Sequence, residues 1–226
     1  MRVDGTGCET RTPGSPGRIT MQRILFVTAH DDDAVLMASH FLAGDAEKVI
    51  LTLSCSDATG GSPGEFTAAY AGIPRLRCLL LEGTGDAGDK DRDMNIHCDK
   101  QTTLAVMEYI REFKPDTVIT NSPDDMHNDH RETSKIVQQA VFHLRTWGNY
   151  NRPIQLYCGE IFQPLAAPHM VLPADINLKR QVMTRFSSQN NQYKWLELVE
   201  TLNRFRALQF NSDYAYAEAF SVICKW

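Results

Sequence analysis

Short apolar runs alternate with longer helical patterns along most of this chain, and that alternation limits the folds open to it. The first run, Arg23 to Thr28 (RILFVT), is rich in β-forming residues and apolar over most of its length. Such a run is typical of a strand in a parallel sheet, which helices cover on both faces. We expect further strands at Lys48 to Leu53, Arg77 to Leu81, Thr117 to Thr120, Ile154 to Cys158 and Glu218 to Cys224.

Helical patterns fill much of the sequence between these runs. From Asp99 to Lys114, apolar residues such as Leu104, Met107 and Ile110 recur at helical spacing, and Pro115 ends the pattern. We expect further helices at Ala34 to Leu42, Arg131 to Trp147, Ile176 to Ser188 and Gln192 to Leu208. Strands that alternate with helices in this way predict a Rossmann-like, doubly wound and mainly parallel α/β sheet.

The first twenty residues differ in composition from the rest of the chain. They are rich in Gly, Pro, Thr and Arg, and they lack the apolar segment of a secretory signal. We therefore expect a disordered leader over residues 1–20 and a single domain over residues 21–226. On this interpretation Met21 is a candidate for the true start of the protein.

Charge and cysteine usage narrow the classes of function. The chain carries a net charge of −5 and no long basic run, whereas nucleic-acid binding needs clustered Lys and Arg. No apolar run approaches the roughly 18 residues that suggest a membrane span. The 6 cysteines are scattered and form no C-x-x-C pair, as is typical of reduced thiols in the cytoplasm. We therefore expect a cytoplasmic protein with neither a nucleic-acid partner nor a membrane span.

Two polar clusters directly follow expected strands. His30-Asp31-Asp32-Asp33 comes after the first strand, and His127-Asn128-Asp129-His130 lies in the loop after Thr117 to Thr120. In doubly wound sheets ligands bind beyond the carboxyl ends of the strands, so both clusters are expected at one edge. A catalytic zinc site needs three N or O ligands and an open position. His30, Asp33 and His130 meet that need, and the same set also suits Fe²⁺, Mn²⁺ or Co²⁺.

Each cluster also has a purely structural interpretation. Acids at the start of a helix complement its dipole, so the Asp31 to Asp33 run could be a solvated helix N-terminus. The two histidines of the second cluster could be surface residues of a loop. The joint occurrence favours the metal interpretation, because both clusters follow expected buried strands at the functional edge of the sheet. Three adjacent carboxylates also need a cation or raised pKa values.

These motifs resemble those of the LmbE-like, or PIG-L, family of zinc-dependent N-deacetylases, whose members act on N-acetylglucosaminyl compounds. The family's first motif, A-H-P-D-D-E, stands here as Ala29-His30-Asp31-Asp32-Asp33-Ala34, and its second motif, H-P-D-H, as His127-Asn128-Asp129-His130. The resemblance covers about Arg23 to Val222. The stretch Lys114 to Thr120 also matches the family, and individually weaker matches near the C-terminus are Phe186 to Gln189 and Tyr216 to Phe220.

The resemblance implies a zinc-dependent hydrolase that removes an N-acetyl group from an N-acetylglucosamine-like amino sugar or glycoconjugate. Residue by residue, it implies that Asp32 is the general base. It implies that the zinc ligands are His30, Asp33 and His130, and that His127, oriented by Asp129, stabilises the tetrahedral intermediate.

Four positions depart from the family pattern. Asp31 and Asn128 replace the prolines of the two motifs, and Ala34 replaces the glutamate of the first. None of these is a ligand position, although the charge of Asp31 is expected to affect loop stiffness and the pKa values of the metal site. Some relatives carry a tyrosine two residues before the first histidine of the second motif. Asp125 stands there in this chain, so no tyrosine contribution is expected.

Three other classes of function compete with this one. A nucleotide-binding Rossmann module requires G-x-G-x-x-G after the first strand, where this chain has acids that would repel a pyrophosphate. A non-catalytic sugar-binding relative would be indicated by the loss of a ligand or of the base, and neither is lost. A metal-dependent hydrolase of another amide or an ester, for example a deformylase, is the closest alternative, because the same site would serve it.

Substrate contacts are expected in the polar loops that follow the second and third strands. Asp57 and Asp86 are the candidate substrate-binding residues there, although flexible polar loops are the alternative interpretation. The expected partner is a small-molecule N-acyl amino sugar, and the sequence is also compatible with a homo-oligomer.

Overall fold

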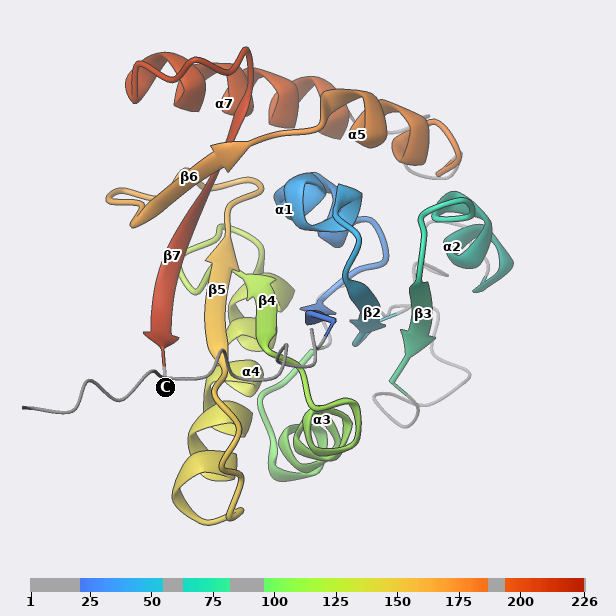
Figure 1. Cartoon of the computed structure of the whole chain (residues 1–226), viewed down its shortest axis with the longest axis vertical. Helices are drawn as coiled ribbons and strands as arrows, with labels where there is room; N and C mark the ends of the chain where they lie inside the picture. The colour runs from blue at the N-terminus through green and yellow to red at the C-terminus, as the bar shows by residue number, and fades with distance from the viewer. Residues whose placement is uncertain (1–20, 55–62, 82–95, 187–193, 226) are drawn as a thin grey trace, which may run out of the picture.

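A computed structural model of the 226-residue chain describes residues 21–54, 63–81, 96–186 and 194–225. Its helices and strands follow one another along the chain as shown in Figure 1. In order they are β1 (Arg23–Thr28), α1 (Asp33–Ala43), β2 (Glu47–Thr52), α2 (Pro63–Ala69), β3 (Leu76–Leu80), α3 (Lys100–Phe113), β4 (Thr117–Asn121), α4 (Asn128–Thr146), β5 (Gln155–Gly159), β6 (Met170–Pro173), α5 (Ile176–Met183), α7 (Trp195–Gln209) and β7 (Ala217–Lys225).

The strands of the described residues form one 7-stranded sheet in the order β3-β2-β1-β4-β5-β7-β6. The pairs from β3 to β5 are all parallel, whereas β7 runs antiparallel to both β5 and β6. The order of the strands reverses at β1, which pairs with β2 on one side and with β4 on the other. This confirms the expected Rossmann-like, doubly wound and mainly parallel α/β fold.

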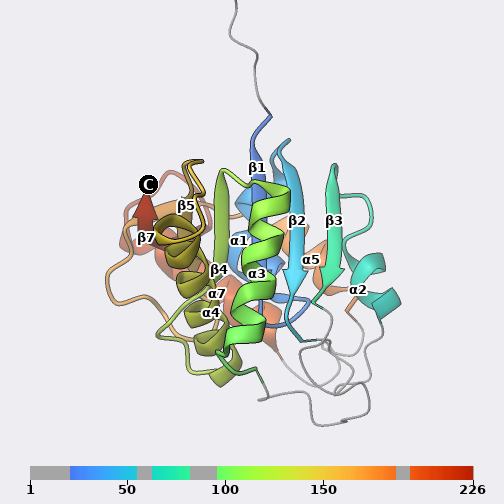
Figure 2. The same cartoon turned by 90° about the horizontal axis from the view of Figure 1, so that it is seen from below.

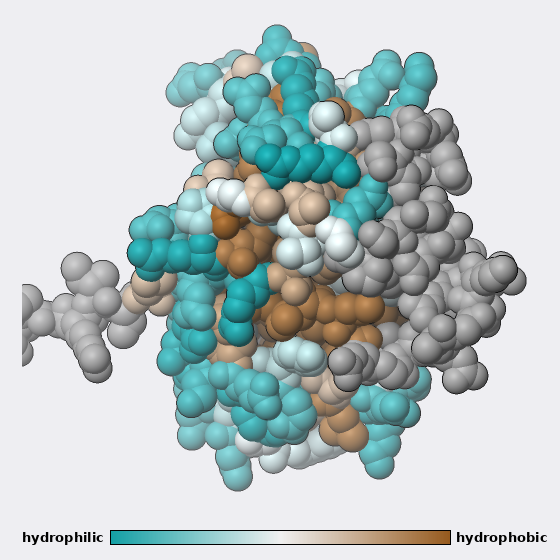
Figure 3. Space-filling view, turned by 90° about the vertical axis from the view of Figure 1, so that its right-hand side faces the viewer, coloured by the Kyte–Doolittle hydropathy of each residue, from teal (hydrophilic) through white to brown (hydrophobic). Residues whose placement is uncertain are grey.

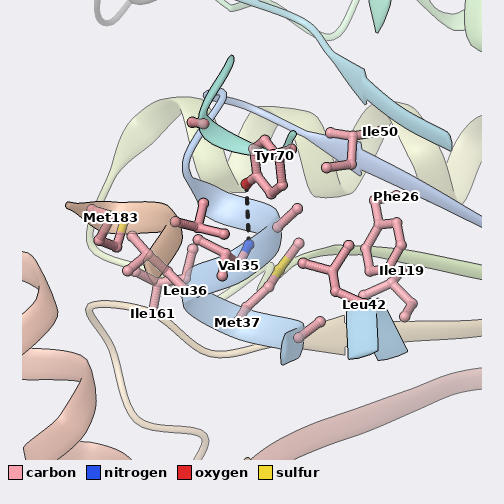
Figure 4. Close-up of a cluster of buried hydrophobic side chains, with 14 of the residues drawn as sticks. Phe26, Val35, Leu36, Met37, Leu42, Ile50, Tyr70, Ile119, Ile161 and Met183 are labelled. Atoms are coloured by element: carbon pink, nitrogen blue, oxygen red, sulfur yellow. Dashed lines mark hydrogen bonds between the residues drawn. The ribbon is translucent and has the colours of Figure 1, made fainter. Parts of the chain in front are cut away.

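Helices cover both faces of the sheet, as a parallel sheet requires. Figure 1 shows α1, α5 and α7 on one side, and Figure 2 shows α3 and α4 in front of the strands on the other. The strands supply alternate side chains to two cores. In β1, Phe26 packs with the α1 side, where Figure 4 shows it near Ile119, and Leu25 and Val27 pack with the α3 and α4 side.

Among the described residues, two elements were not predicted by the sequence patterns. Helix α2 begins at Pro63, inside the expected polar loop, and the short strand β6 pairs with β7 through Met170 to Pro173. The expected helix from Ile176 ends at Met183, five residues before Ser188, which lies outside the described residues. The central strands agree with expectation to within about a residue or two at each end.

The sheet ends at β3 on one side, where the strand is half-buried and its Arg77 side chain is exposed. A charged side chain on an edge strand disfavours pairing with another chain. On this side of the molecule, apolar residues gather in the middle of the face, between hydrophilic rims (Figure 3). Within the described part of the chain, no helix combines the length and apolarity needed to cross a bilayer.

Candidate metal centre

The two polar clusters meet where the strand order reverses. His30 to Asp33 lie directly after β1, and Asn128 begins α4, a few residues after β4. The ends of the two strands are joined by Asn121, the last residue of β4, whose Oδ1 accepts a hydrogen bond from the Ala29 backbone N–H at 3.0 Å. The fold therefore brings together residues that are about 100 positions apart in the chain.

Four donor atoms from three residues at this junction lie at metal-ligand separations. His130 Nε2 is 3.2 Å from Asp33 Oδ1 and 3.3 Å from His30 Nδ1, and His30 Nδ1 is 3.7 Å from Asp33 Oδ2. Ligands about 2.1 Å from a tetrahedral zinc ion lie about 3.4 Å from one another. The three residues therefore fit a divalent ion in both spacing and chemistry.

His127 lies beside this set. Ligand atoms of His30, His127 and His130 all lie within 4.8 Å of one another, and the His127 ring centroid is 4.9 Å from each of the other two. The His127 Nδ1 accepts a hydrogen bond from the Asp129 backbone N–H at 3.3 Å. The set that contains Asp33 has the shorter separations, so His127 fits better as a neighbour of the ion than as its third ligand.

The three adjacent aspartates are buried rather than solvated. Asp31 and Asp33 are 1% exposed and Asp32 is 6% exposed. Asp32 occupies the N-cap position of α1, yet its side chain makes no capping hydrogen bond. The interpretation of this run as a solvated helix N-terminus is therefore wrong, because burying three carboxylates costs free energy that a helix start does not require.

Asp33 is held in place by neighbours that the sequence patterns did not single out. Its Oδ2 accepts hydrogen bonds from the His30 backbone N–H at 2.9 Å and from Asn121 Nδ2 at 3.0 Å. Asn121 therefore binds the β1 backbone with its oxygen and Asp33 with its nitrogen. Its position as a polar residue at the carboxyl end of a buried strand is the signal that could have identified it.

Burial and charge separate the pKa values of neighbouring groups. Burial, together with the carboxylates of Asp33 and Asp31, raises the pKa of Asp32 to about 7. Burial also acts to raise the pKa of Asp33, but the charge and hydrogen bond of His130 hold it well below its usual value. For His130, burial acts to lower the pKa, but Asp33 and Asp125 raise it to about 9.

Asp129 is fully buried at the first turn of α4. Its Oδ2 lies 3.4 Å from His30 Nε2, and its Oδ1 accepts a hydrogen bond from the Ile96 backbone N–H at 3.2 Å. Its carboxylate thus contacts the opposite edge of the His30 ring from the one that faces Asp33 and His130. The contact to His127 described above comes from the Asp129 backbone.

Two further residues at the centre were missed by sequence reasoning. Asp125 lies 3.3 Å from His130 Nδ1 through its Oδ1, on the side of the ring away from Asp33. The Phe162 ring stacks on His130 with centroids 5.2 Å apart and planes 10° apart. Phe162 follows β5, so only the pairing of β5 beside β4 could have brought it to this place.

Other residues that the sequence singled out lie away from the candidate metal centre or outside the described residues. Asp57 and Asp86, the candidate substrate-binding residues, lie outside the described residues, as do Ser187 to Gln189. Phe186 is fully buried in the core beside α1. Glu218, within the Tyr216 to Phe220 match, is buried and contacts α1 rather than the metal centre.

Comparison with known proteins identifies the family. The PIG-L family model, described as GlcNAc-PI de-N-acetylase, matches residues 25–141, which is 117 of the 226 residues. The chain belongs to the PIG-L family. Both polar clusters lie within the matched region, and β5, β6, α5, α7 and β7 lie beyond it. No curated protein matches the chain.

Solved structures share the fold over most of the chain. A conserved protein from Thermus thermophilus is 20% identical, with a TM-score of 0.71 over 91% of this chain and 96% of its own. N,N'-diacetylchitobiose deacetylase from Pyrococcus horikoshii is 16% identical, with a TM-score of 0.67 over 89% and 84%. The 4-carboxy-2-hydroxymuconate hydratase from Pseudomonas putida is 19% identical, with a TM-score of 0.68 over 90% and 97%. Proteins with this fold therefore catalyse more than one type of reaction, and the reaction of this chain has to be argued from its site.

Proposed function

We propose that this protein is a zinc-dependent hydrolase that removes the N-acetyl group from an N-acetylglucosamine-like amino sugar or glycoconjugate. The observation that carries the proposal is the separation of 3.2–3.7 Å among donor atoms of His30, Asp33 and His130. Membership of the PIG-L family supports a deacetylase, and buried Asp32 beside these ligands supports hydrolysis. A bound zinc ion supplies Lewis-acid chemistry, since it polarises a carbonyl and lowers the pKa of water.

Asp32 is the group that moves the proton. Its raised pKa, about 7, suits a base that takes a proton near neutral pH and gives it up again. Asp32 takes a proton from the attacking water as the oxygen–carbon bond forms. It then returns this proton to the nitrogen as the carbon–nitrogen bond breaks, because an amine leaves far more readily than an amide anion. The products are acetate and the free amino sugar.

His127 supplies a hydrogen-bond donor for the oxygen of the substrate amide. Since its Nδ1 accepts the Asp129 backbone N–H, the neutral ring carries its proton on Nε2. A donor held in place before the reaction stabilises the negative charge that develops on that oxygen. Asp129 therefore orients His127 through its backbone and contacts His30 through its carboxylate.

The test combines metal analysis with a substrate panel. Purified protein is assayed for bound metal, and amine release is measured on N-acetylglucosamine, a glycoside of it and N,N'-diacetylchitobiose. Formyl and propionyl amides and acetate esters of the same sugars are included, with His130→Ala as the matched inactive control. Amine release that requires zinc and prefers acetyl supports the proposal.

Each other outcome of this test contradicts a specific part of the proposed function. Faster turnover of formyl amides or esters would favour the alternative hydrolases. Sugar binding without turnover would indicate a non-catalytic relative. Activity that needs iron(II), manganese or cobalt instead of zinc would change the metal but leave the reaction.

We further propose a cytoplasmic location and a small-molecule partner. The cysteines of the described residues, Cys78, Cys98, Cys158 and Cys224, are all free thiols, which is consistent with a reducing compartment.

A further inference from the structure

Asp125 is a buried carboxylate that stands outside both motifs and contacts three parts of the centre. It is 2% exposed, and its Oδ1 lies 3.3 Å from His130 Nδ1 and accepts the His127 backbone N–H at 2.9 Å. Its Oδ2 accepts the Phe162 backbone N–H at 3.2 Å. The Asp125 side chain therefore connects the second motif with the loop after β5.

These contacts determine which nitrogen of His130 faces the other ligands. A neutral imidazole carries one N–H, and a carboxylate beside Nδ1 favours the proton at that nitrogen. The lone pair is then on Nε2, which is the atom 3.2 Å from Asp33 and 3.3 Å from His30. Of the two neutral tautomers of His130, Asp125 therefore favours the one whose Nε2 can bind a cation.

The same carboxylate also fixes the plane of the ring. Phe162 stacks nearly parallel on His130, and Asp125 holds the backbone of Phe162. His130 is itself fully buried, so its ring is confined by Phe162 on one face and by carboxylates at both nitrogens. A ring held in this way loses little freedom when it binds an ion, which favours binding.

We infer that Asp125 is a positioning residue, which sets the tautomer and orientation of His130 for metal binding. The inference rests on the metal site of the proposed function. Carboxylates that hold metal-binding histidines raise the basicity of the ligand, and their loss typically weakens metal affinity by about 10- to 100-fold.

Zinc affinity measured against a chromophoric chelator tests the inference. Asp125→Asn keeps the size of the side chain and one acceptor, whereas alanine would also free both backbone N–H groups. We expect Asp125→Asn to bind zinc about 10- to 100-fold more weakly than the wild type. Its neighbour Asp124 is exposed, so Asp124→Asn is the matched control and should keep wild-type affinity.

A second readout separates positioning from general loss of structure. In zinc-loaded protein labelled with ¹⁵N-histidine, NMR should show a protected His130 Nδ1–H in the wild type and in Asp124→Asn. In Asp125→Asn this signal should shift or exchange rapidly, while the signals of the exposed His97 stay unchanged. If Asp125 had only a general structural role, its substitution would not change the His130 signal selectively.

The outcomes distinguish this inference from the proposed function. Equal zinc affinities of wild type and Asp125→Asn, with the His130 signal unchanged, would overturn the inference alone. A wild type that binds zinc and releases no amine would contradict the proposed reaction, and a weaker-binding Asp125→Asn would still support the inference. A wild type that binds no divalent metal ion would overturn both.

Discussion

Asp32 and Asp33 are adjacent in the chain, yet the fold gives their carboxylates opposite environments. Asp33 accepts hydrogen bonds from the His30 backbone and from Asn121, and it faces His130, so its charged form is stabilised. Asp32 lies among like charges at the start of α1, without a capping bond. One residue is thereby suited to hold a cation and the other to exchange a proton.

We expect Asp32→Asn and Asp33→Asn to fail in different ways. Asp32→Asn removes the proton acceptor, so kcat should fall by roughly 10²- to 10⁴-fold while bound metal is retained. Asp33→Asn removes a charged ligand, so bound metal should be lost. Elemental analysis and steady-state kinetics on the best substrate measure both effects. Near-full turnover in the first variant, or full metal content in the second, would refute this division of roles.

The sequence predicted the individual residues of the two motifs but not the neighbouring residues that hold them in place. His30, Asp33 and His130 could be proposed because His and Asp are suitable ligands and both clusters follow buried strands. The position of Asn121 at a strand end marks it as a candidate, but its contacts with Ala29 and Asp33 exist only because β1 pairs with β4. The contact of Asp125 with Phe162 likewise exists only because β5 lies beside β4. Single polar residues after a strand are common, and their spacing alone does not reveal what they bind.

Helix α1 is kinked at Ala38, whose φ of −148° and ψ of 45° are not helical. At the kink, Glu218 of β7 accepts hydrogen bonds from the backbone N–H groups of Ser39 at 2.7 Å and His40 at 3.1 Å. Lys179 of α5 donates to the Leu36 carbonyl and lies 2.7 Å from Glu218. The buried ion pair therefore satisfies backbone groups that the kink leaves without helical partners.

Removing one partner of this ion pair should destabilise the protein more than removing both charges. Lys179→Met leaves the Glu218 carboxylate buried without its cation, so the free energy of unfolding should fall by about 3–5 kcal/mol. Adding Glu218→Gln to that variant should recover about 1–3 kcal/mol, because the remaining charge is removed. Urea unfolding of both variants measures the difference.

The neighbouring Arg180–Glu200 pair is exposed and provides the control. Arg180→Gln should change stability little, because solvent screens surface ion pairs. If the double variant of the buried pair were less stable than Lys179→Met alone, the unpaired charge would not be the cause of the loss.

Among the elements, the parallel strands were predictable and the last part of the sheet was not. The apolar runs of β1, β2 and β4 are strong signals, because a strand buried on both faces needs apolar side chains throughout. Strand β6 has only 4 residues and ends in Pro173, so it carries no clear pattern. Its pairing comes from β7, more than 40 residues later, which local sequence does not indicate.

The candidate metal centre lies between the two helical layers of the whole molecule. Asp33 begins α1, on one face of the sheet, and His130 lies in α4, on the other. Because an ion that binds only the folded protein stabilises it, zinc should raise the melting temperature. At free zinc about 100 times Kd, we expect about 2.7 kcal/mol of stabilisation. For a protein of this size, that is a rise of about 5–11 °C.

Scanning calorimetry with and without zinc provides the measurement, and His130→Ala provides the control. The variant lacks one of the three ligands, so its melting temperature should respond weakly to zinc. An equal rise in wild type and variant would show that zinc stabilises the protein from another site.

The position of β7 between β5 and β6 sets an order of events for a chain that is still being made. Strand β6 has its place in the sheet only through β7, and 43 residues lie between Pro173 and Ala217. At synthesis rates of roughly 5–20 residues per second, β6 waits about 2–9 s for its partner to be made. Throughout that interval the outer edge of β5 is also uncovered. The parallel part of the sheet, from β3 to β5, can therefore pair before β7 has been made, and the remaining part closes only when β7 inserts.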